Sequence, residues 1–99
     1  ANGQNIYPEE VEAVVNNQDY VVESVVVDRA SKLVALVYLD HDAIRKAGLD
    51  DETIADIPEN IRINANKALP SYSQLQKVEV MDKPFEKTPK MSIKRFMYK

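Results

Sequence analysis

The first part of the sequence carries a helical repeat of apolar residues. Val11, Val14 and Val15 recur at spacings of three and four residues, which predicts one apolar face of a helix. Pro8 suits the first position of that helix, because its missing N–H needs no partner there. We therefore expect a short helix that begins at Pro8 and ends in the polar residues 16–19.

Two apolar segments of the strand type follow this helix. Residues 20–28 are rich in β-branched side chains, which predicts a strand. Residues 33–39 are apolar at successive positions, which predicts a second strand, buried on both faces and central in its sheet. The short polar break between the two segments favours an antiparallel hairpin.

The middle of the chain returns to helical spacing. Residues 43–47 fit one or two helical turns that end at Gly48. A longer apolar stripe then comprises Ile54, Ile57, Ile61, Ala65 and Leu69. Pro58 interrupts this stripe, so we expect either a kink or two helices, of which the main one spans about 58–69.

The last third predicts a strand, a loop and a short closing element. Residues 75–81 alternate in the manner of a third strand. Two prolines within 83–90 exclude regular structure and predict a loop, and residues 93–98 predict a strand or a helical turn. The order helix, strand, strand, helix, strand predicts a small α+β domain over residues 1–99, with an antiparallel strand pair, a third strand and helices packed on the sheet.

The net charge of −3 hides an uneven distribution of charge. Residues 1–82 hold 15 acidic and 7 basic residues, whereas residues 83–99 hold six basic residues against Glu86. A basic end on an acidic body indicates either an anionic partner or merely a solvated terminus. Because the acidic body would repel a long polyanion, we expect no nucleic-acid partner, and a compact anion such as a nucleotide phosphate fits better.

Most catalytic motifs are absent from the sequence. It holds no cysteine, and its two glycines, Gly3 and Gly48, cannot form a glycine-rich phosphate loop. His41 lies between Asp40 and Asp42, a pattern more typical of a solvated turn than of a metal site, so we expect no bound metal. No apolar run reaches membrane-spanning length. Residues 1–5 resemble no signal peptide and lack a starting Met, so we expect a fragment or a processed chain.

Both ends of the chain resemble the C-terminal domain of adenylate-forming enzymes. Residues 3–12 (GQNIYPEEVE) resemble the segment that begins this domain in acyl-CoA synthetases, especially the long-chain-fatty-acid–CoA ligase type. Residues 84–98 (PFEKTPKMSIKRFMY) resemble the family's last motif, and residues 25–27 and 33–37 match its strand pair. The resemblance therefore extends over essentially the whole chain.

The resemblance implies one part of a ligase that acts on an acid and a thiol. Such enzymes use ATP and Mg²⁺ to convert a carboxylic acid into an acyl-adenylate, and then transfer the acyl group to the thiol of coenzyme A. A large N-terminal domain holds Mg²⁺ and most of the substrate sites, and the C-terminal domain is a lid that rotates between the two half-reactions. The implied partner is thus the N-terminal domain of the same polypeptide, in a cytoplasmic enzyme or one peripheral to the membrane, and the excised lid would be inactive.

The resemblance also implies site residues within 83–99, with one departure. The family's catalytic lysine falls on Ser92, whose hydroxyl carries no charge, between Lys90 and Lys94. Three hypotheses follow: Lys90 or Lys94 substitutes for that lysine, adenylation is weak and depends on another group, or Ser92 is an engineered or sporadic change. If the segment is extended, all three side chains point to the same side.

Two further positions and one alternative function complete these expectations. Gly3 would line the coenzyme A channel, and Arg95 would bind a cofactor or form an ion pair at the surface or between domains. The alternative is a non-catalytic binding or regulatory module of the same fold that has lost its lysine. Long-chain acids are implied by the resemblance alone, and short, aromatic or carrier-linked acids stay open.

Overall fold

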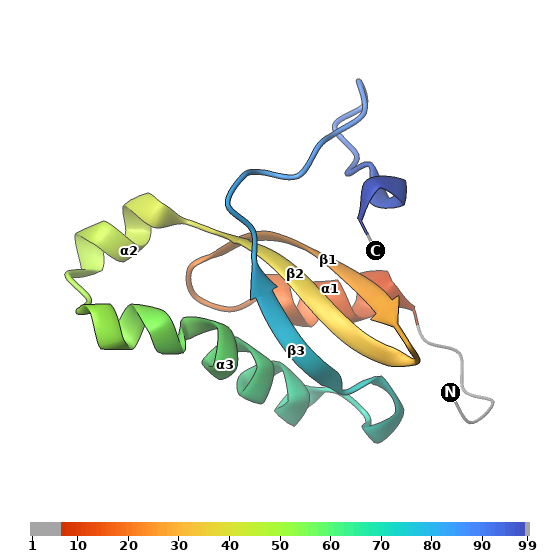
Figure 1. Ribbon diagram of the computed structural model, residues 1–99, viewed down its shortest axis with the longest axis horizontal. Helices are drawn as coiled ribbons and strands as arrows, with labels where there is room; N and C mark the ends of the chain where they lie inside the picture. Colours follow the sequence, from red (N-terminus) through yellow and green to blue (C-terminus); the bar gives the residue numbers. More distant parts are fainter. Residues whose placement is uncertain (1–6, 99) are drawn as a thin grey trace.

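A three-stranded sheet organises the chain in the computed structural model, which describes residues 7–98 (Figure 1). Helices and strands follow in the order α1 (Pro8–Asn16), β1 (Val21–Arg29), β2 (Lys32–Leu39), α2 (His41–Ala47), α3 (Asp51–Ala68) and β3 (Leu75–Val80). Two 3₁₀ turns are η1 (Ser71–Ser73) and η2 (Arg95–Met97). The predicted α+β class and the predicted order of elements are confirmed.

The sheet has the strand order β1-β2-β3, so β2 is central as predicted. β1 and β2 pair antiparallel, and β2 and β3 pair parallel. A parallel pair requires a crossover, which α2 and α3 supply. The hairpin is tighter than the sequence indicates: Arg29 pairs with Lys32, and the two loop residues Ala30 and Ser31 both have positive φ, as in a type I′ turn.

Alternation along the strands divides the core into two layers. On one face, strand residues such as Val26 and Val37 pack with helix residues such as Val15 and Ile61. On the other face a smaller cluster is formed by Val25, Val27, Val34, Leu36 and Phe85. Helices α1 and α3 thus cover one face, and the segment that follows β3 covers the other.

Helix α3 excludes one of the two alternatives expected at Pro58, namely two separate helices. The structure has a single helix over Asp51–Ala68 with Pro58 inside it, not two helices. The Asp50 carboxylate accepts a hydrogen bond from Thr53 N at 2.8 Å, so the helix has its own start well before the proline. Ile57 and Ile61 are buried on the same face as Ala65, whereas Ile54 is more exposed than the stripe predicted.

Candidate functional site

The C-terminal segment predicted as a loop contains an ordered β-hairpin. We name residues 86–94 the basic hairpin. Thr88 N donates to Ser92 O at 2.7 Å, and Lys94 N donates to Glu86 O at 2.8 Å. Lys87 and Ile93 form an isolated antiparallel bridge between these two bonds. The prolines therefore exclude a long strand, but they do not exclude local pairing.

The loop of the basic hairpin consists of Pro89, Lys90 and Met91. Met91 N donates to Thr88 O at 2.8 Å, which closes a turn with Pro89 at its second position, where the fixed φ of proline is favoured. Met91 has a φ of 65°, the left-handed conformation that commonly ends a three-residue hairpin loop. The segment is thus not extended at Lys90, so the condition under which Lys90, Ser92 and Lys94 would share one side by simple alternation is not met.

Apolar contacts anchor the basic hairpin to the open face of the sheet. Phe85, just before the hairpin, is 4% exposed and belongs to the second core layer, against which Ile93 and Tyr98 also pack. The rings of Phe85 and Tyr98 meet edge to face with centroids 5.0 Å apart. Because Phe85 is buried, its ring is not available for stacking on a nucleotide base.

Two ion pairs tie the same segment to the sheet and to α1. Lys87 Nζ lies 2.9 Å from Glu23 Oε1 on β1. The guanidinium of Arg95 binds both carboxylate oxygens of Glu12, with 2.6 Å between Arg95 Nη1 and Glu12 Oε2. Hydrogen bonding to Glu12, more than the nearby negative charges, raises the pKa of Arg95 above its usual value.

The other described cations of the segment, within residues 83–98, have no such partners. Among residues 7–98, Lys83, Lys90 and Lys94 form no ion pair. Ile93 packs against the second core layer, and alternation along the returning strand (residues 92–94) therefore places Ser92 and the half-buried Lys94 on the other side of the chain. The basic hairpin therefore presents uncompensated ammonium charge beside Ser92, an arrangement suited to a compact anion.

Large apolar side chains of this segment are exposed next to the free cations. Met91 is 73% and Phe96 75% exposed, and Met97 is half exposed. Figure 1 shows the hairpin loop standing clear of the sheet before η2 returns toward the body. Exposed apolar side chains that are clustered, rather than scattered singly, typically mark a contact surface.

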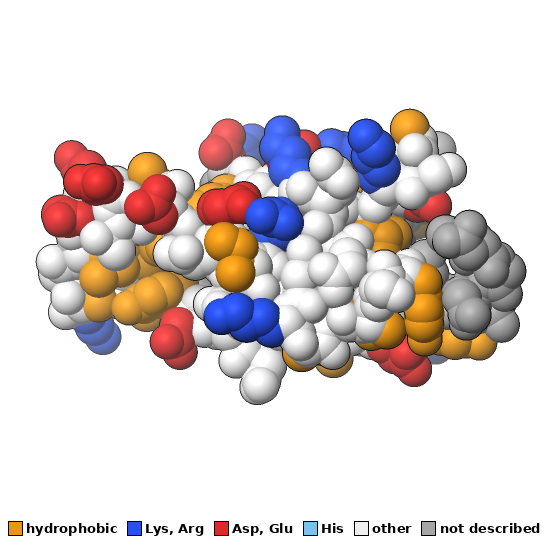
Figure 2. Space-filling model, turned by 90° about the horizontal axis from the view of Figure 1, so that it is seen from below, with side chains coloured by type: hydrophobic (Ala, Val, Ile, Leu, Met, Phe, Trp, Pro, Cys, Tyr) orange, Lys and Arg blue, Asp and Glu red, His pale blue; other side chains and the backbone are white. Residues whose placement is uncertain are grey.

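The opposite end of the molecule is acidic. Figure 2 shows acidic side chains gathered where α2 and the start of α3 form the left end of the view. The sequence places there Asp42, Asp50, Asp51, Glu52 and Asp56. This separation of charge supports a short anionic ligand at the basic hairpin rather than an extended polyanion across the surface.

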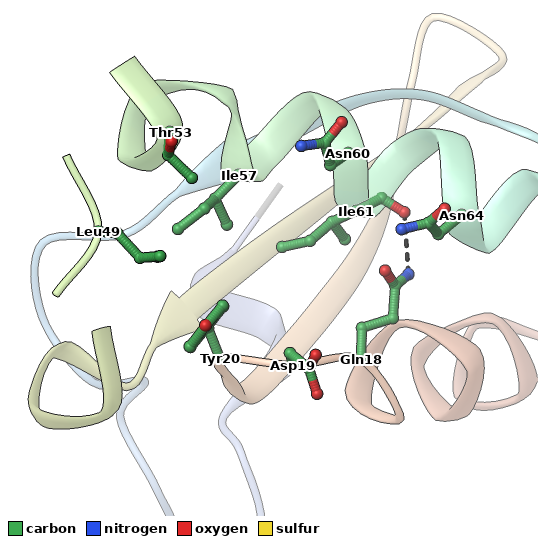
Figure 3. Close-up of a pocket in the computed structure, with 9 residues that line it drawn as sticks. All are labelled: Gln18, Asp19, Tyr20, Leu49, Thr53, Ile57, Asn60, Ile61 and Asn64. Atoms are coloured by element: carbon green, nitrogen blue, oxygen red, sulfur yellow. Dashed lines mark hydrogen bonds between the residues drawn. The ribbon is translucent and has the colours of Figure 1, made fainter. Parts of the chain in front are cut away.

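A separate hollow of about 250 Å³ lies between α3 and the turn that joins α1 to β1. Leu49, Ile57 and Ile61 line it together with the amides of Asn60 and Asn64 (Figure 3). Its lining also includes Gln18, Asp19, Tyr20 and Thr53, and thus no cation. The Gln18 amide donates to Ile61 O at 2.9 Å across it, so this hollow is unsuited to a phosphate and serves the packing of the turn on α3.

The structure brings the sequence-predicted residues together only in part. Lys90, Ser92 and Lys94 lie on one hairpin, and Arg95 follows it. The expected role of Arg95 in cofactor binding stays a prediction, because its guanidinium is engaged by Glu12 in this conformation. Gly3, expected in the coenzyme A channel, lies outside the described residues.

Sequence reasoning missed the two acidic anchors, Glu12 and Glu23. Glu12 is 5% exposed, and its carboxylate also accepts a hydrogen bond from Val26 N at 2.7 Å. Its position beside Val11, at the border of the apolar face of α1, was the available signal. Glu23 lies within a run of apolar residues, which is the corresponding signal in β1.

Two kinds of site find no support in residues 7–98. That range contains no group of three or more His, Cys, Asp or Glu side chains placed to hold a metal ion, and His41 instead meets Tyr38 edge-on. No helix described by the structure combines the length and the apolar character needed to cross a membrane.

Comparison with protein families gives one match over nearly the entire chain. The family model of the AMP-binding enzyme C-terminal domain matches residues 1–98. No curated protein matches the sequence.

Solved structures share the fold at low sequence identity. Apo MatB from Rhodopseudomonas palustris superposes with a TM-score of 0.71 at 21% identity, over 96% of this chain and 18% of that one. A benzoate CoA ligase from Burkholderia xenovorans gives 0.70 at 24%, with the same coverage. A fatty acyl CoA synthetase from Mycobacterium tuberculosis gives 0.69 at 20%, over 96% of this chain and 17% of that one. The chain thus spans less than a fifth of the length of these proteins.

Proposed function

Because the chain belongs to the family of AMP-binding enzyme C-terminal domains, we propose that it is the mobile lid of a larger ATP-dependent acyl-CoA ligase. In this proposal residues 1–99 form the lid, and residues 83–99 carry its final motif. The larger, cytoplasmic enzyme joins a carboxylic acid to ATP as an acyl-adenylate, releases pyrophosphate, and passes the acyl group to coenzyme A. The partner of the lid is the N-terminal domain of the same polypeptide.

The observation that carries this proposal is the basic hairpin itself. It is held by three backbone hydrogen bonds and by the buried Phe85 just before it, yet Lys90 and Lys94 are left without ion-pair partners within residues 7–98. Free ammonium groups on a fixed hairpin can neutralise phosphate oxygens when the hairpin enters a cleft, where charge interactions exceed those in water. The exposed Met91 and Phe96 supply apolar area for contact with the body of the enzyme.

Because Ser92 stands at the position of the family's lysine, the positive charge that faces the phosphate must come from another residue. A hydroxyl can donate a hydrogen bond to a phosphate but cannot neutralise it. Lys94 lies on the same side of the returning strand as Ser92, whereas Lys90 lies in the turn on the far side of Met91. We therefore assign the charge-bearing role to Lys94 in preference to Lys90, with Ser92 as a neutral hydrogen-bond donor beside it.

The other groups of the reaction belong to the missing part of the enzyme. Mg²⁺ prefers carboxylate oxygens and water, and residues 7–98 offer no cluster of acidic side chains to hold it. We assign Mg²⁺ to the N-terminal domain, together with the pocket for the acid, which we propose to be a long-chain fatty acid. Gly3 is assigned to the coenzyme A channel, where the absence of a side chain permits close backbone approach.

ATP–pyrophosphate exchange by the full-length enzyme tests this proposal. The assay is run with long-chain, short-chain and aromatic acids. Exchange that is fastest with long-chain acids supports the proposal, and exchange with aromatic acids alone would overturn the acid class only. If no acid supports exchange, the ligase proposal itself is wrong.

The lysine assignment is tested in the same assay with three variants. Lys94→Ala is expected to slow exchange by about tenfold or more, and Lys90→Ala by less, since loss of one preorganised charge contact costs at most about 10²–10³. Ser92→Lys is expected to accelerate exchange, because it places an ammonium at the position of the family's lysine. Equal effects of the two alanine variants would overturn the preference for Lys94.

A further inference from the structure

Glu12 and Arg95 reach each other from opposite faces of the sheet. Glu12 belongs to α1, which packs on the first core layer through Val11 and Val15. Arg95 follows the basic hairpin, which packs on the second layer. The two side chains meet beside β1, the edge strand, where the carboxylate of Glu12 also accepts the hydrogen bond from Val26 N.

We infer that Glu12 is a positioning residue for the basic hairpin, and that it acts through Arg95 to fix the direction in which Lys90 and Lys94 point. Glu12 lies behind the hairpin, in contact with β1, and is not placed to touch a ligand. Only the catalytic consequence of this inference rests on the proposed lid function. The geometric part concerns this chain alone.

The joint is rigid because each of its groups is held more than once. One carboxylate oxygen of Glu12 is shared between Val26 N at 2.7 Å and Arg95 Nη1 at 2.6 Å, and the second oxygen binds Arg95 Nη2. A planar guanidinium bound by both of its ends has few orientations left. Since η2 begins at Arg95, fixing this side chain fixes the end of the returning strand one residue earlier, at Lys94.

The burial of Glu12 makes the joint specific. Its carboxylate is almost fully enclosed, so the loss of Arg95 would leave a buried charge poorly paired, which is costly. Glu9 on the same helix also acts on the charge of Arg95, but it is exposed and forms no hydrogen bond to Arg95 within residues 7–98. Glu9 therefore provides a matched control at the same helix end.

The experiment compares Glu12→Gln, Arg95→Lys and Glu9→Gln in the full-length enzyme. Glu12→Gln keeps an acceptor for Val26 N but removes the ion pair, and Arg95→Lys keeps the charge but loses the two-pronged contact. The first readout is hydrogen exchange at Thr88 N and Lys94 N, whose partners lie within the hairpin. The second readout is the rate of ATP–pyrophosphate exchange, set against the rate of thioester formation from supplied acyl-adenylate.

We expect the hydrogen-exchange rate of the two hairpin amides to rise about tenfold in Glu12→Gln and somewhat less in Arg95→Lys, which corresponds to the loss of a partly buried ion pair. Adenylation should slow by a similar factor while thioester formation is retained, and Glu9→Gln should match the wild type. Unchanged protection of the hairpin amides would overturn the inference. The inference would also be overturned if both half-reactions slowed equally and hydrogen exchange became faster throughout the sheet, because that pattern indicates a general loss of stability.

The two proposals fail in different ways. If the wild-type enzyme adenylates no acid, the proposed function is wrong, and the hydrogen-exchange comparison still decides whether Glu12 fixes the hairpin. If Arg95→Lys abolishes adenylation while Glu12→Gln has no effect on either readout, Arg95 acts directly on a ligand, and its positioning by Glu12 is excluded.

Discussion

The Tyr98 hydroxyl accepts a hydrogen bond from Glu86 N at 2.7 Å while its ring meets the Phe85 ring in an edge-to-face contact. A residue near the end of the chain therefore closes the entry to the basic hairpin. Tyr98→Phe keeps the ring contact and loses the acceptor, which should lower the free energy of unfolding by about 1 kcal/mol. Phe85→Ala removes a buried ring and should cost about 3 kcal/mol or more.

Denaturant unfolding of the full-length enzyme, or of this chain where it folds alone, measures both changes. Phe96→Ala is the matched control, because Phe96 is an exposed aromatic residue of the same segment. A larger loss of stability for Phe96→Ala than for Phe85→Ala would contradict the assignment of Phe85 to the core.

The left-handed conformation of Met91 gives a second prediction. The left-handed conformation costs a residue other than glycine about 1 kcal/mol. Glycine avoids this cost but loses more backbone entropy on folding, which offsets part of the gain. Met91→Gly should therefore leave stability nearly unchanged or slightly higher, and Met91→Val should lower it by more than about 1 kcal/mol, since β-branched residues tolerate positive φ poorly. The shift of the thermal midpoint distinguishes the two, and equal shifts would argue against a strained turn.

The two-residue loop of the β1–β2 hairpin gives a third prediction. Ala30 and Ser31 have φ values of 53° and 67°, for which Asn and Gly are the preferred residues. The double substitution Ala30→Asn with Ser31→Gly should raise the free energy of unfolding by about 1 kcal/mol. Thermal unfolding measures the gain, and Ser31→Val at the same loop should produce a loss instead.

Asp50 links the start of α3 to pH. Hydrogen bonds from the Thr53 side chain and backbone N–H lower the pKa of the Asp50 carboxyl. A lowered pKa in the folded state means that this contribution is present above the unfolded pKa and is lost as the pH falls through the folded value. Asp50→Asn keeps a capping acceptor without a charge, so its stability relative to the wild type should improve as the pH falls below 4, in urea titrations at several pH values. A difference that is constant with pH would contradict this.

Local periodicity was sufficient for most of the fold. The valines of α1 and the β-branched run of β1 each predicted their element, because one face of each packs on the same core. Pro58 does not divide α3, because the cap at Asp50 and the buried Ile57 keep the helix continuous despite the missing N–H of the proline. The end of α3 was therefore easier to predict than its start.

The residues of the candidate site came from the resemblance to the family's last motif, and the role of Lys90, Ser92 and Lys94 stays a prediction. The contacts that support these residues could not be predicted from the sequence. The contact of Glu12 with Arg95 joins residues 83 positions apart, and no local pattern reports such a pair. The hairpin itself depends on Met91 adopting a backbone conformation that its side chain disfavours, so sequence preference alone indicated only a loop.

The Glu12 carboxylate, which accepts the hydrogen bond from Val26 N, also protects the exposed edge of β1. The unpaired edge of a β-strand can pair with a strand of a second polypeptide. Proteins usually block such edges with charged side chains or cover them with a helix or loop. Here the Glu12 carboxylate accepts the hydrogen bond of Val26 N, so this backbone donor of β1 cannot bind another strand. The Ser24 hydroxyl, also on β1, donates to the Asn16 side chain at 2.7 Å. Removal of the Glu12 carboxylate would therefore free this backbone donor, and we expect the protein to associate into oligomers or fibres at high concentration.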